Sequence, residues 1–160
     1  MSNSIVVYFS ATGVTKKVAS KLSEKIGADL FEIVPRELYT KEDLDWKNPE
    51  SRSSLEMGDF ESRPEIKDRI KDFDKYSTVY LGFPIWWYQA PTIISTFLEA
   101  YDFTGKTISV FATSGGSTLG QTETILRQMS PSAKWRPGII LNSWNNTKVE
   151  AWVDSVNQLN

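Results

Sequence analysis

The sequence lacks two residue types on which many enzymes depend, because none of its 160 residues is a cysteine or a histidine. Without cysteine there are no disulfide bonds, thiolate metal sites or cysteine nucleophiles. Without histidine, the usual general base, the Ser-His-Asp arrangement and most transition-metal sites are also excluded. No tight acidic cluster is visible either, so we expect neither a metal site nor a catalytic side chain.

Long apolar runs and strong charge are absent as well. No run approaches the roughly 20 residues of a membrane span, so we expect no membrane partner. A net charge of −2 does not provide the basic surface that nucleic-acid binding needs, so we expect no nucleic-acid partner. The chain enters a predicted strand almost at once, which leaves no room for a signal peptide and favours the cytoplasm. The length fits a single domain over residues 1–160.

The apolar residues that are present form short runs, most of them β-branched or aromatic. Such runs predict strands covered on both faces, as in a parallel sheet. They occupy residues 5–9, 30–34, 79–83, 107–112 and 139–141. Helical patterns alternate with them at residues 14–26, 66–73, 93–101, 125–129 and 149–159. This alternation predicts an α/β fold, a three-layer α/β/α sandwich with right-handed crossovers.

Local signals mark several helix ends. Gly27 stands where a C-cap glycine belongs. Pro64 and Pro91 each precede a helical pattern, as prolines of a first turn do. The segment from Thr147 to Glu150 is typical of a capping box and predicts the start of the last helix.

Residues 35–63 carry the weakest pattern. A structureless loop of that length is uncommon inside a compact domain. We therefore expect a short helix near residues 41–46, capped by Thr40, and a further turn near residues 54–57. The apolar side chains expected to fold this segment onto the body are Tyr39, Trp46, Leu55, Met57 and Phe60.

Three loops follow predicted strands, at the edge where parallel sheets bind ligands. The first loop, residues 10–15, places the hydroxyls of Ser10, Thr12 and Thr15 around Gly13, between a strand and a helix. Backbone N–H groups and the helix dipole favour an anion at such a helix N-terminus. The loop therefore predicts a phosphate site, with an ordinary capped turn as the alternative.

The second loop, residues 84–91, holds three aromatic residues between Pro84 and Pro91. The prolines stiffen the backbone, and a stiff loop that presents aromatic faces suits stacking on a flat ring. Core packing or a protein contact is the alternative. The third loop, residues 113–120, has three glycines among hydroxyl residues, which allow a close approach to a ligand. A flexible linker is the alternative there.

Together the loops describe a flat heterocycle with a single phosphate, which flavin mononucleotide (FMN) fits best. Neither the dinucleotide fingerprint GxGxxG nor the P-loop is present. At these residues the chain resembles the flavodoxin family. Residues 8–15 (YFSATGVT) are similar to the flavodoxin signature. Three further segments resemble small bacterial flavodoxin-like proteins: residues 82–87 (GFPIWW), 103–107 (FTGKT) and 113–117 (TSGGS).

The resemblance implies a five-stranded parallel sheet in the order 2-1-3-4-5, non-covalent FMN, and the short-chain form, because no long insertion interrupts the last strand. Val14 departs from the asparagine that is common in the family. This change costs one polar side chain but leaves the backbone N–H in place, so we expect FMN binding to survive.

The resemblance also implies three groups of cofactor-binding residues. The phosphate group would be held by Ser10, Thr12, Gly13, Val14 and Thr15. The isoalloxazine ring would be lined by Pro84, Ile85, Trp86, Trp87 and Tyr88. The pyrimidine side or the ribityl chain would meet Thr113, Ser114, Gly115, Gly116, Ser117 and Gly120.

Three functions remain open. A one-electron carrier would dock a redox partner protein, although a net charge of −2 is weak for that role. The second loop also lacks the glycine that eases a backbone flip in typical flavodoxins. A reductase would pass electrons from NAD(P)H to a quinone-type small molecule and needs only a positioned flavin. A non-enzymatic binding module would use the tryptophan-rich surface as a contact patch.

Overall fold

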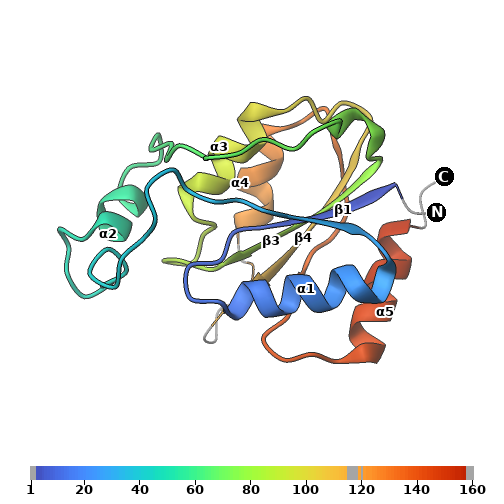
Figure 1. Cartoon of the computed structure of the whole chain (residues 1–160), viewed down its shortest axis with the longest axis horizontal. Coiled ribbons are helices and arrows are strands. Elements are labelled where there is room, and N and C mark those ends of the chain that lie inside the picture. The colour runs from blue at the N-terminus through green and yellow to red at the C-terminus, as the bar shows by residue number, and fades with distance from the viewer. Residues whose placement is uncertain (1–2, 115–118, 120, 158–160) are drawn as a thin grey trace.

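The structure, a computed structural model, describes residues 3–114, 119 and 121–157. Its centre is a parallel sheet in the order β2-β1-β3-β4-β5 (Figure 1). The strands are β1 (Ser4–Tyr8), β2 (Asp29–Glu32), β3 (Thr78–Pro84), β4 (Thr107–Thr113) and β5 (Lys134–Trp135), with β6 (Ile139–Ile140) also paired to β4. Helices α1 (Val14–Ile26) and α5 (Asn146–Asn157) cover one face, and α3 (Thr92–Ala100) and α4 (Thr122–Met129) cover the other. The predicted sandwich and strand order are confirmed.

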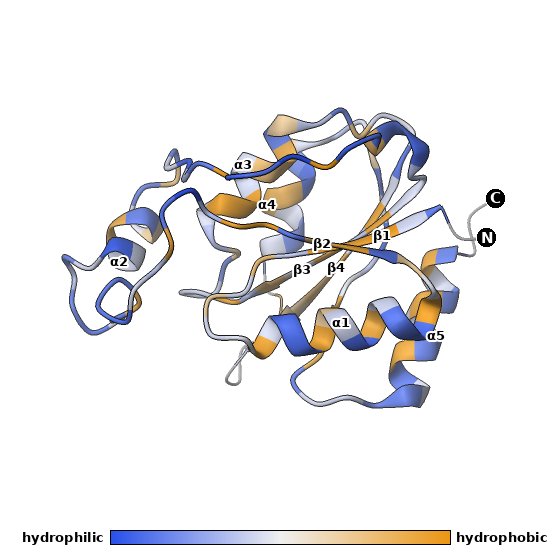
Figure 2. Ribbon diagram, viewed as in Figure 1, coloured by the Kyte–Doolittle hydropathy of each residue, from blue (hydrophilic) through white to orange (hydrophobic). Residues whose placement is uncertain are grey.

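The sheet buries apolar side chains on both faces, which explains why the central strands β1, β3 and β4 are nearly continuous apolar runs (Figure 2). Along β1 the side chains alternate. Val6 belongs to the cluster that contains Leu22 of α1 and Trp152 of α5, whereas Val7 belongs to the cluster that contains Phe97 of α3. The helices are thereby fixed on the two faces of the sheet, and the C-terminal ends of the parallel strands lie between them at one edge.

The last strand is interrupted by a bulge. Trp135 lies opposite Ile108 and Ile139 lies opposite Phe111, so the edge strand takes one residue more than β4 between these pairs. Pro137 lies inside the interruption and has no N–H group to donate. This three-residue break (residues 136–138) separates β5 from β6, and no long insertion occurs there.

The helix predicted over residues 66–73 is wrong. Ile66 instead pairs with Pro35 in an isolated antiparallel bridge. The N–H of Lys67 donates to the carbonyl of Val34, and the N–H of Arg36 donates to the carbonyl of Glu65, each at 2.8 Å. Because this pairing takes up the backbone groups, helical structure in this region is limited to the 3₁₀ turn η1 (Phe73–Lys75).

Two predicted helix ends have different outcomes. Gly27 is confirmed as the C-cap of α1 and has a left-handed φ of 67°. The capping box from Thr147 to Glu150 is wrong as the start of α5, because the helix begins at Asn146. Its cap is Asn145, whose Oδ1 accepts the N–H of Lys148 at 2.9 Å.

Residues 35–63, called the arm from here on, extend away from the sheet (Figure 1). The helix predicted near residues 41–46 is a series of turns, although Thr40 and Asp43 exchange backbone-to-side-chain hydrogen bonds at 2.9 and 3.1 Å. The turn predicted near residues 54–57 is a short helix, α2 (Arg52–Met57).

The expected apolar attachment of the arm is wrong for most of its side chains. Tyr39 does pack against Phe9, with ring centroids 5.7 Å apart. Met57 is half-buried, whereas Trp46, Leu55 and Phe60 are mostly exposed.

Within the described residues, no helix combines the length and apolar character needed to cross a membrane.

Candidate functional site

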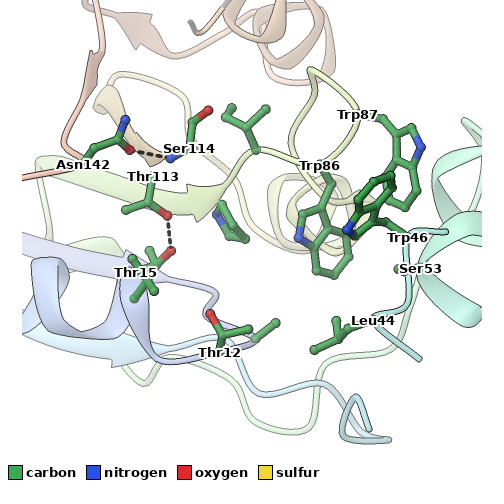
Figure 3. A pocket seen from close by; sticks show the side chains of 14 residues that line it. Thr12, Thr15, Leu44, Trp46, Ser53, Trp86, Trp87, Thr113, Ser114 and Asn142 are labelled. Carbon is green, nitrogen blue, oxygen red and sulfur yellow. Dashed lines mark hydrogen bonds between the residues drawn. The ribbon is translucent and has the colours of Figure 1, made fainter. Parts of the chain in front are cut away.

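A cavity of about 430 Å³ opens where β1, β3 and β4 end (Figure 3). From β1 the chain first adds β2 on one side and then β3 on the other, so the order of addition switches sides between β1 and β3. Open α/β sheets bind ligands at this switch point. The volume lies in the range of small-molecule and cofactor sites. The lining residues are Ala11, Thr12, Val14, Thr15, Leu44, Trp46, Ser53, Pro84, Ile85, Trp86, Trp87, Thr113, Ser114 and Asn142.

The first loop forms a tight turn in front of α1. The N–H of Gly13 donates to Oγ of Ser10 at 3.0 Å. Gly13 has a φ of 96° and is the N-cap of α1, so its position carries no side chain that could take up the first-turn N–H groups. That first turn contains no acidic residue. The helix N-terminus is therefore open to an anion beside Thr12, which is exposed and lines the cavity.

Thr15 and Thr113 join the first and third loops. Their Oγ1 atoms lie 2.8 Å apart, and both residues are buried although they line the cavity. One hydroxyl hydrogen is used between the two oxygens. Each hydroxyl carries one hydrogen, so the pair has a second hydrogen that has no acceptor among the described residues and could be donated to a bound group.

The second loop is a two-residue hairpin turn. Trp86 and Gln89 exchange both backbone hydrogen bonds, at 2.8 and 2.9 Å. Between them, Trp87 and Tyr88 have φ values of 48° and 64°. Positive φ at both central residues defines a type I′ turn, which normally carries asparagine and glycine. Each side chain held there costs about 1 kcal/mol.

This turn directs the indole rings. Trp86 packs edge-on against Phe9 and Tyr39, with ring centroids 5.7 and 5.6 Å apart. Trp86 and Trp87 both line the cavity (Figure 3), whereas Tyr88 lies outside its lining and is 76% exposed. The structure therefore separates Tyr88 from the other residues of the predicted aromatic group.

The third loop is described only in part. Thr113 and Ser114 line the cavity, and the N–H of Ser114 donates to Oδ1 of Asn142 at 2.5 Å. The remaining predicted residues lie outside the described residues: Gly115, Gly116, Ser117 and Gly120.

The arm supplies lining residues that the sequence did not indicate as site residues. Leu44, Trp46 and Ser53 close the cavity from the side opposite the sheet edge (Figure 3). Trp46 was predicted only as an anchor of the arm, and nothing in the sequence around Ser53 or Asn142 marks a contact with the strand ends.

The hydroxyl of Ser53 is an unsatisfied polar group. The residue is 2% exposed, and its Oγ has no hydrogen-bond partner among the described residues. A buried hydroxyl without a partner costs roughly 1–3 kcal/mol. Ser53 is also one of the residues that line the cavity.

The cavity provides no charged lining side chain within the described part of the chain. Lys16 and Lys17 lie with Gly13 around a separate surface hollow, just outside. No group of three acidic residues that could hold a metal ion occurs in residues 3–114, 119 and 121–157. The cavity therefore offers hydroxyls and N–H groups at one end and apolar, aromatic walls at the other.

Comparisons with known proteins agree with this geometry. A family model described as flavodoxin matches residues 3–156. A protein from Bacteroides eggerthii DSM 20697, provisionally described as a flavoprotein, is 45% identical, with a TM-score of 0.93 over 98% of this chain and 98% of that chain. A similarly described protein from Bacteroides uniformis ATCC 8492 is 42% identical, with a TM-score of 0.90 over 96% and 98% of the two chains.

A more distant structure shares the fold. It is a flavoprotein from Lactobacillus acidophilus NCFM in complex with FMN, 21% identical, with a TM-score of 0.74 over 96% of this chain and 99% of that chain. No curated protein matches the sequence.

Proposed function

This chain belongs to the flavodoxin family, and we propose that it binds FMN non-covalently in the cavity at the ends of β1, β3 and β4 and transfers electrons through it. One observation carries the proposal. The same cavity joins a helix N-terminus with hydroxyl side chains to a set of aromatic walls. A phosphate needs the first feature and a flat ring system needs the second.

The residues present fit FMN in three ways. Thr12, Thr15 and the first-turn N–H groups of α1 would hold the phosphate. The indoles of Trp86 and Trp87 would line the ring system. The unpartnered Oγ of Ser53 would gain a hydrogen bond from the polar edge or the ribityl hydroxyls of the cofactor. The fold is also that of a flavoprotein that contains FMN.

FMN, when bound, supplies electron and hydride chemistry that the side chains of this protein do not have. The protein's own contribution is placement. The Thr15–Thr113 pair holds two loops in register, and the Trp86 ring is fixed by its edge-on contacts. The apolar walls at the ring-binding end would exclude water from a bound ring system. No titratable side chain lines the cavity in the described residues.

The first candidate role is an electron carrier that docks a redox partner protein. The second is a reductase that takes electrons from NAD(P)H and passes them to a small molecule. A specific observation favours the second role: exposed aromatic rings, Trp46, Trp87 and Tyr88, surround a further cavity next to the first. An NADH:FMN oxidoreductase shares the fold at 16% identity and a TM-score of 0.56.

The binding half of the proposal is tested by titrating FMN into the FMN-free protein and following flavin fluorescence. The double variant Thr12→Val/Thr15→Val is expected to bind FMN at least tenfold more weakly, because it removes two hydroxyls from the anion end. Its far-UV circular dichroism should match the parent. Unchanged FMN affinity in the folded double variant contradicts the proposed phosphate site, and a parent protein that takes up no FMN contradicts the whole proposal.

The role is tested by reducing the FMN-loaded protein without oxygen. Stepwise addition of dithionite that accumulates a stable one-electron-reduced flavin supports the carrier. Direct two-electron reduction, together with rapid bleaching by NADH or NADPH, supports the reductase.

A further inference from the structure

We propose that Arg52 is a positioning residue for the cofactor cavity, although its side chain is not part of the cavity lining. It holds the arm together and, through the ring of Tyr39, fixes the indole of Trp86. The inference rests on the proposed function, because the walls that Arg52 positions are those expected to surround FMN. It also assigns a role to the arm, which none of the sequence motifs explains.

The guanidinium of Arg52 joins parts of the arm that are distant in sequence. Its Nε donates to Oε2 of Glu56 at 2.9 Å, one turn further along α2. Its Nη1 donates to the carbonyl of Glu37 at 2.7 Å. Its Cζ lies 3.9 Å from the centroid of the Tyr39 ring, which is within the range of a cation–π contact. The arginine therefore ties α2 to the segment of the arm that lies nearest the sheet.

The position of Arg52 is unfavourable for the helix that carries it. Arg52 is the first residue of α2, directly after the N-cap Ser51, and the helix dipole disfavours a positive charge there. A helix of six residues is also marginal in water on its own. The Arg52 side chain is nevertheless only 22% exposed, although the arm extends away from the sheet. Its tertiary contacts, and not the helix, account for an arginine at this position.

Tyr39 connects this arginine to the cavity wall. Its ring packs edge-on against Phe9 and Trp86, with centroids 5.7 and 5.6 Å apart. Its hydroxyl donates to the carboxylate of Glu56, which is the same group that pairs with Arg52. Phe9 is buried in the core, whereas Trp86 lines the cavity. A continuous series of contacts therefore leads from the guanidinium to the indole that would border the flavin ring.

Arg52 also helps to place the part of the lining that the arm supplies. Ser53 is the next residue along α2, and its N–H donates to the carbonyl of Asp43 at 2.9 Å. Asp43 directly precedes Leu44, and both Leu44 and Ser53 line the cavity (Figure 3). The placement of α2 thus determines where these two lining residues lie. Loss of the arginine should disturb the arm and the Trp86 wall together.

The expected consequence for FMN is slow release. Side chains and loops that become ordered only when a ligand binds reduce its affinity. With Arg52 in place, the arm and the Trp86 ring are already ordered by protein contacts. Without it, part of the binding free energy would be used to order them. Such losses appear mainly in the dissociation rate.

The test compares FMN release from the parent and three variants. Arg52→Met removes the guanidinium, and Arg52→Lys keeps the charge but has no planar group to lie on Tyr39. Arg36→Met is the matched control, because Arg36 is an arm arginine in a 2.9 Å ion pair with Glu65 and does not line the cavity. We expect FMN to leave Arg52→Met about tenfold faster than the parent. Arg52→Lys should also release FMN faster, and Arg36→Met should behave like the parent.

The release rate is measured by diluting FMN-loaded protein and following the recovery of flavin fluorescence. Visible circular dichroism of the bound flavin shows whether the walls around the ring have moved, which a purely stabilising role would not cause. It should change in both Arg52 variants and not in Arg36→Met. Far-UV circular dichroism identifies the variants that are folded. Release and visible circular dichroism like those of the parent in folded Arg52→Met or Arg52→Lys overturn the proposal.

A double-mutant cycle tests the route through Tyr39. Tyr39→Ala removes the ring between Arg52 and Trp86, so Arg52→Met should cause a much smaller further loss of FMN affinity in that background than in the parent. Fully additive losses overturn the route.

Near-UV circular dichroism of the FMN-free protein keeps this outcome separate from that of the proposed function. The signal reports the packing of Tyr39 against Trp86 without cofactor, and it should lose intensity in Arg52→Met but not in Arg36→Met. A parent that takes up no FMN but shows this loss contradicts the proposed function alone. A parent that binds FMN, together with an Arg52→Met variant that binds and releases it equally well, contradicts the role of Arg52 alone.

Discussion

The Oγ1 atoms of Thr15 and Thr113 lie 2.8 Å apart, which joins the first turn of α1 to the end of β4 across 98 residues of sequence. Both residues are buried and both line the cavity. The pair therefore has two separable roles. It satisfies two buried hydroxyls, which bears on stability, and it keeps one hydroxyl hydrogen available, which bears on ligand binding.

We predict that the two single variants Thr15→Val and Thr113→Val each lower the free energy of unfolding of the FMN-free protein by about 1–3 kcal/mol, because each leaves the other buried hydroxyl without its partner. The double variant should lose much less than the sum, because valine replaces both hydroxyl groups at similar shape. Urea unfolding followed by tryptophan fluorescence measures all four proteins.

The same variants separate stability from binding. The double variant Thr15→Val/Thr113→Val is expected to bind FMN more weakly than the parent, even though it recovers much of the stability that the single variants lose. If the two losses in stability simply add, the hydroxyl pair does not stabilise the fold in the way its geometry indicates.

The glycines at the two ends of α1 provide a second prediction. Gly13 and Gly27 have φ values of 96° and 67°, and a Cβ at either position would meet no atom within 4 Å. Gly13→Ala and Gly27→Ala should therefore each destabilise the protein through backbone strain alone, by about 1–2 kcal/mol. Thermal or urea unfolding measures this cost.

The two glycine variants differ in what they should do to FMN. Gly13 precedes the helix N-terminus of the candidate site, whereas Gly27 lies at the far end of the helix. Only Gly13→Ala is expected to reduce FMN affinity as well as stability. Equal FMN affinity in both variants would show that the conformation of the first loop does not matter for binding.

The sequence predicted the sheet well for a physical reason. Strands covered on both faces are mostly apolar, so β1, β3 and β4 appear as nearly continuous apolar runs, although β4 also contains the buried Ser109. The spacing of Ile66, Ile70 and Phe73 predicted a helix and was misleading. All three side chains do pack onto the core, but Ile66 and Ile70 do so from a segment that is not helical. The backbone of Ile66 pairs with Pro35 instead. Side-chain spacing cannot detect a backbone pairing with a distant residue.

The site was predictable where it follows strand ends. The sequence placed Thr12, Trp86 and Thr113 on separate loops, and the structure brings them to one cavity. Their roles toward FMN stay predictions. Trp46 and Ser53 were not predicted as site residues, because the arm reaches the cavity through tertiary placement that no local motif encodes. The sequence also cannot indicate that the Ser53 hydroxyl lacks a hydrogen-bond partner among the described residues, because this depends on its burial in the folded protein.

The strained turn leads to a third prediction. Tyr88 has a φ of 64° and is 76% exposed, so its side chain contributes little packing to offset the cost of the left-handed conformation. Tyr88→Gly should raise the free energy of unfolding of the FMN-free protein by up to about 1 kcal/mol. Urea unfolding measures the change, with Tyr88→Ala as the control that removes the ring but keeps the strain. A loss of stability in Tyr88→Gly would mean that packing of the ring outweighs the strain.

The last prediction concerns Tyr39, which supports Trp86 from the arm at a ring-centroid distance of 5.6 Å. Its hydroxyl donates to the carboxylate of Glu56. Burial, and then the hydrogen bond and negative charge of Glu56, raise the pKa of Tyr39 well above its usual range. Because the pKa is higher in the folded than in the unfolded protein, this contribution to stability is complete below about pH 10 and is lost as the pH rises further.

Tyr39→Phe should therefore lower the free energy of unfolding by about 1–3 kcal/mol at pH 8, where the hydrogen bond to the charged carboxylate is intact in the parent. Above about pH 10 the difference between parent and variant should narrow by roughly 1 kcal/mol per pH unit. Tyr8 and Tyr76, whose pKa values burial raises to about 12, are present in both proteins and do not alter the difference. Urea unfolding at pH 8, 10 and 11 measures it, with Tyr88→Phe as the control on an exposed phenol. A difference that stays constant across this range would show that the Tyr39–Glu56 contact does not govern alkaline stability.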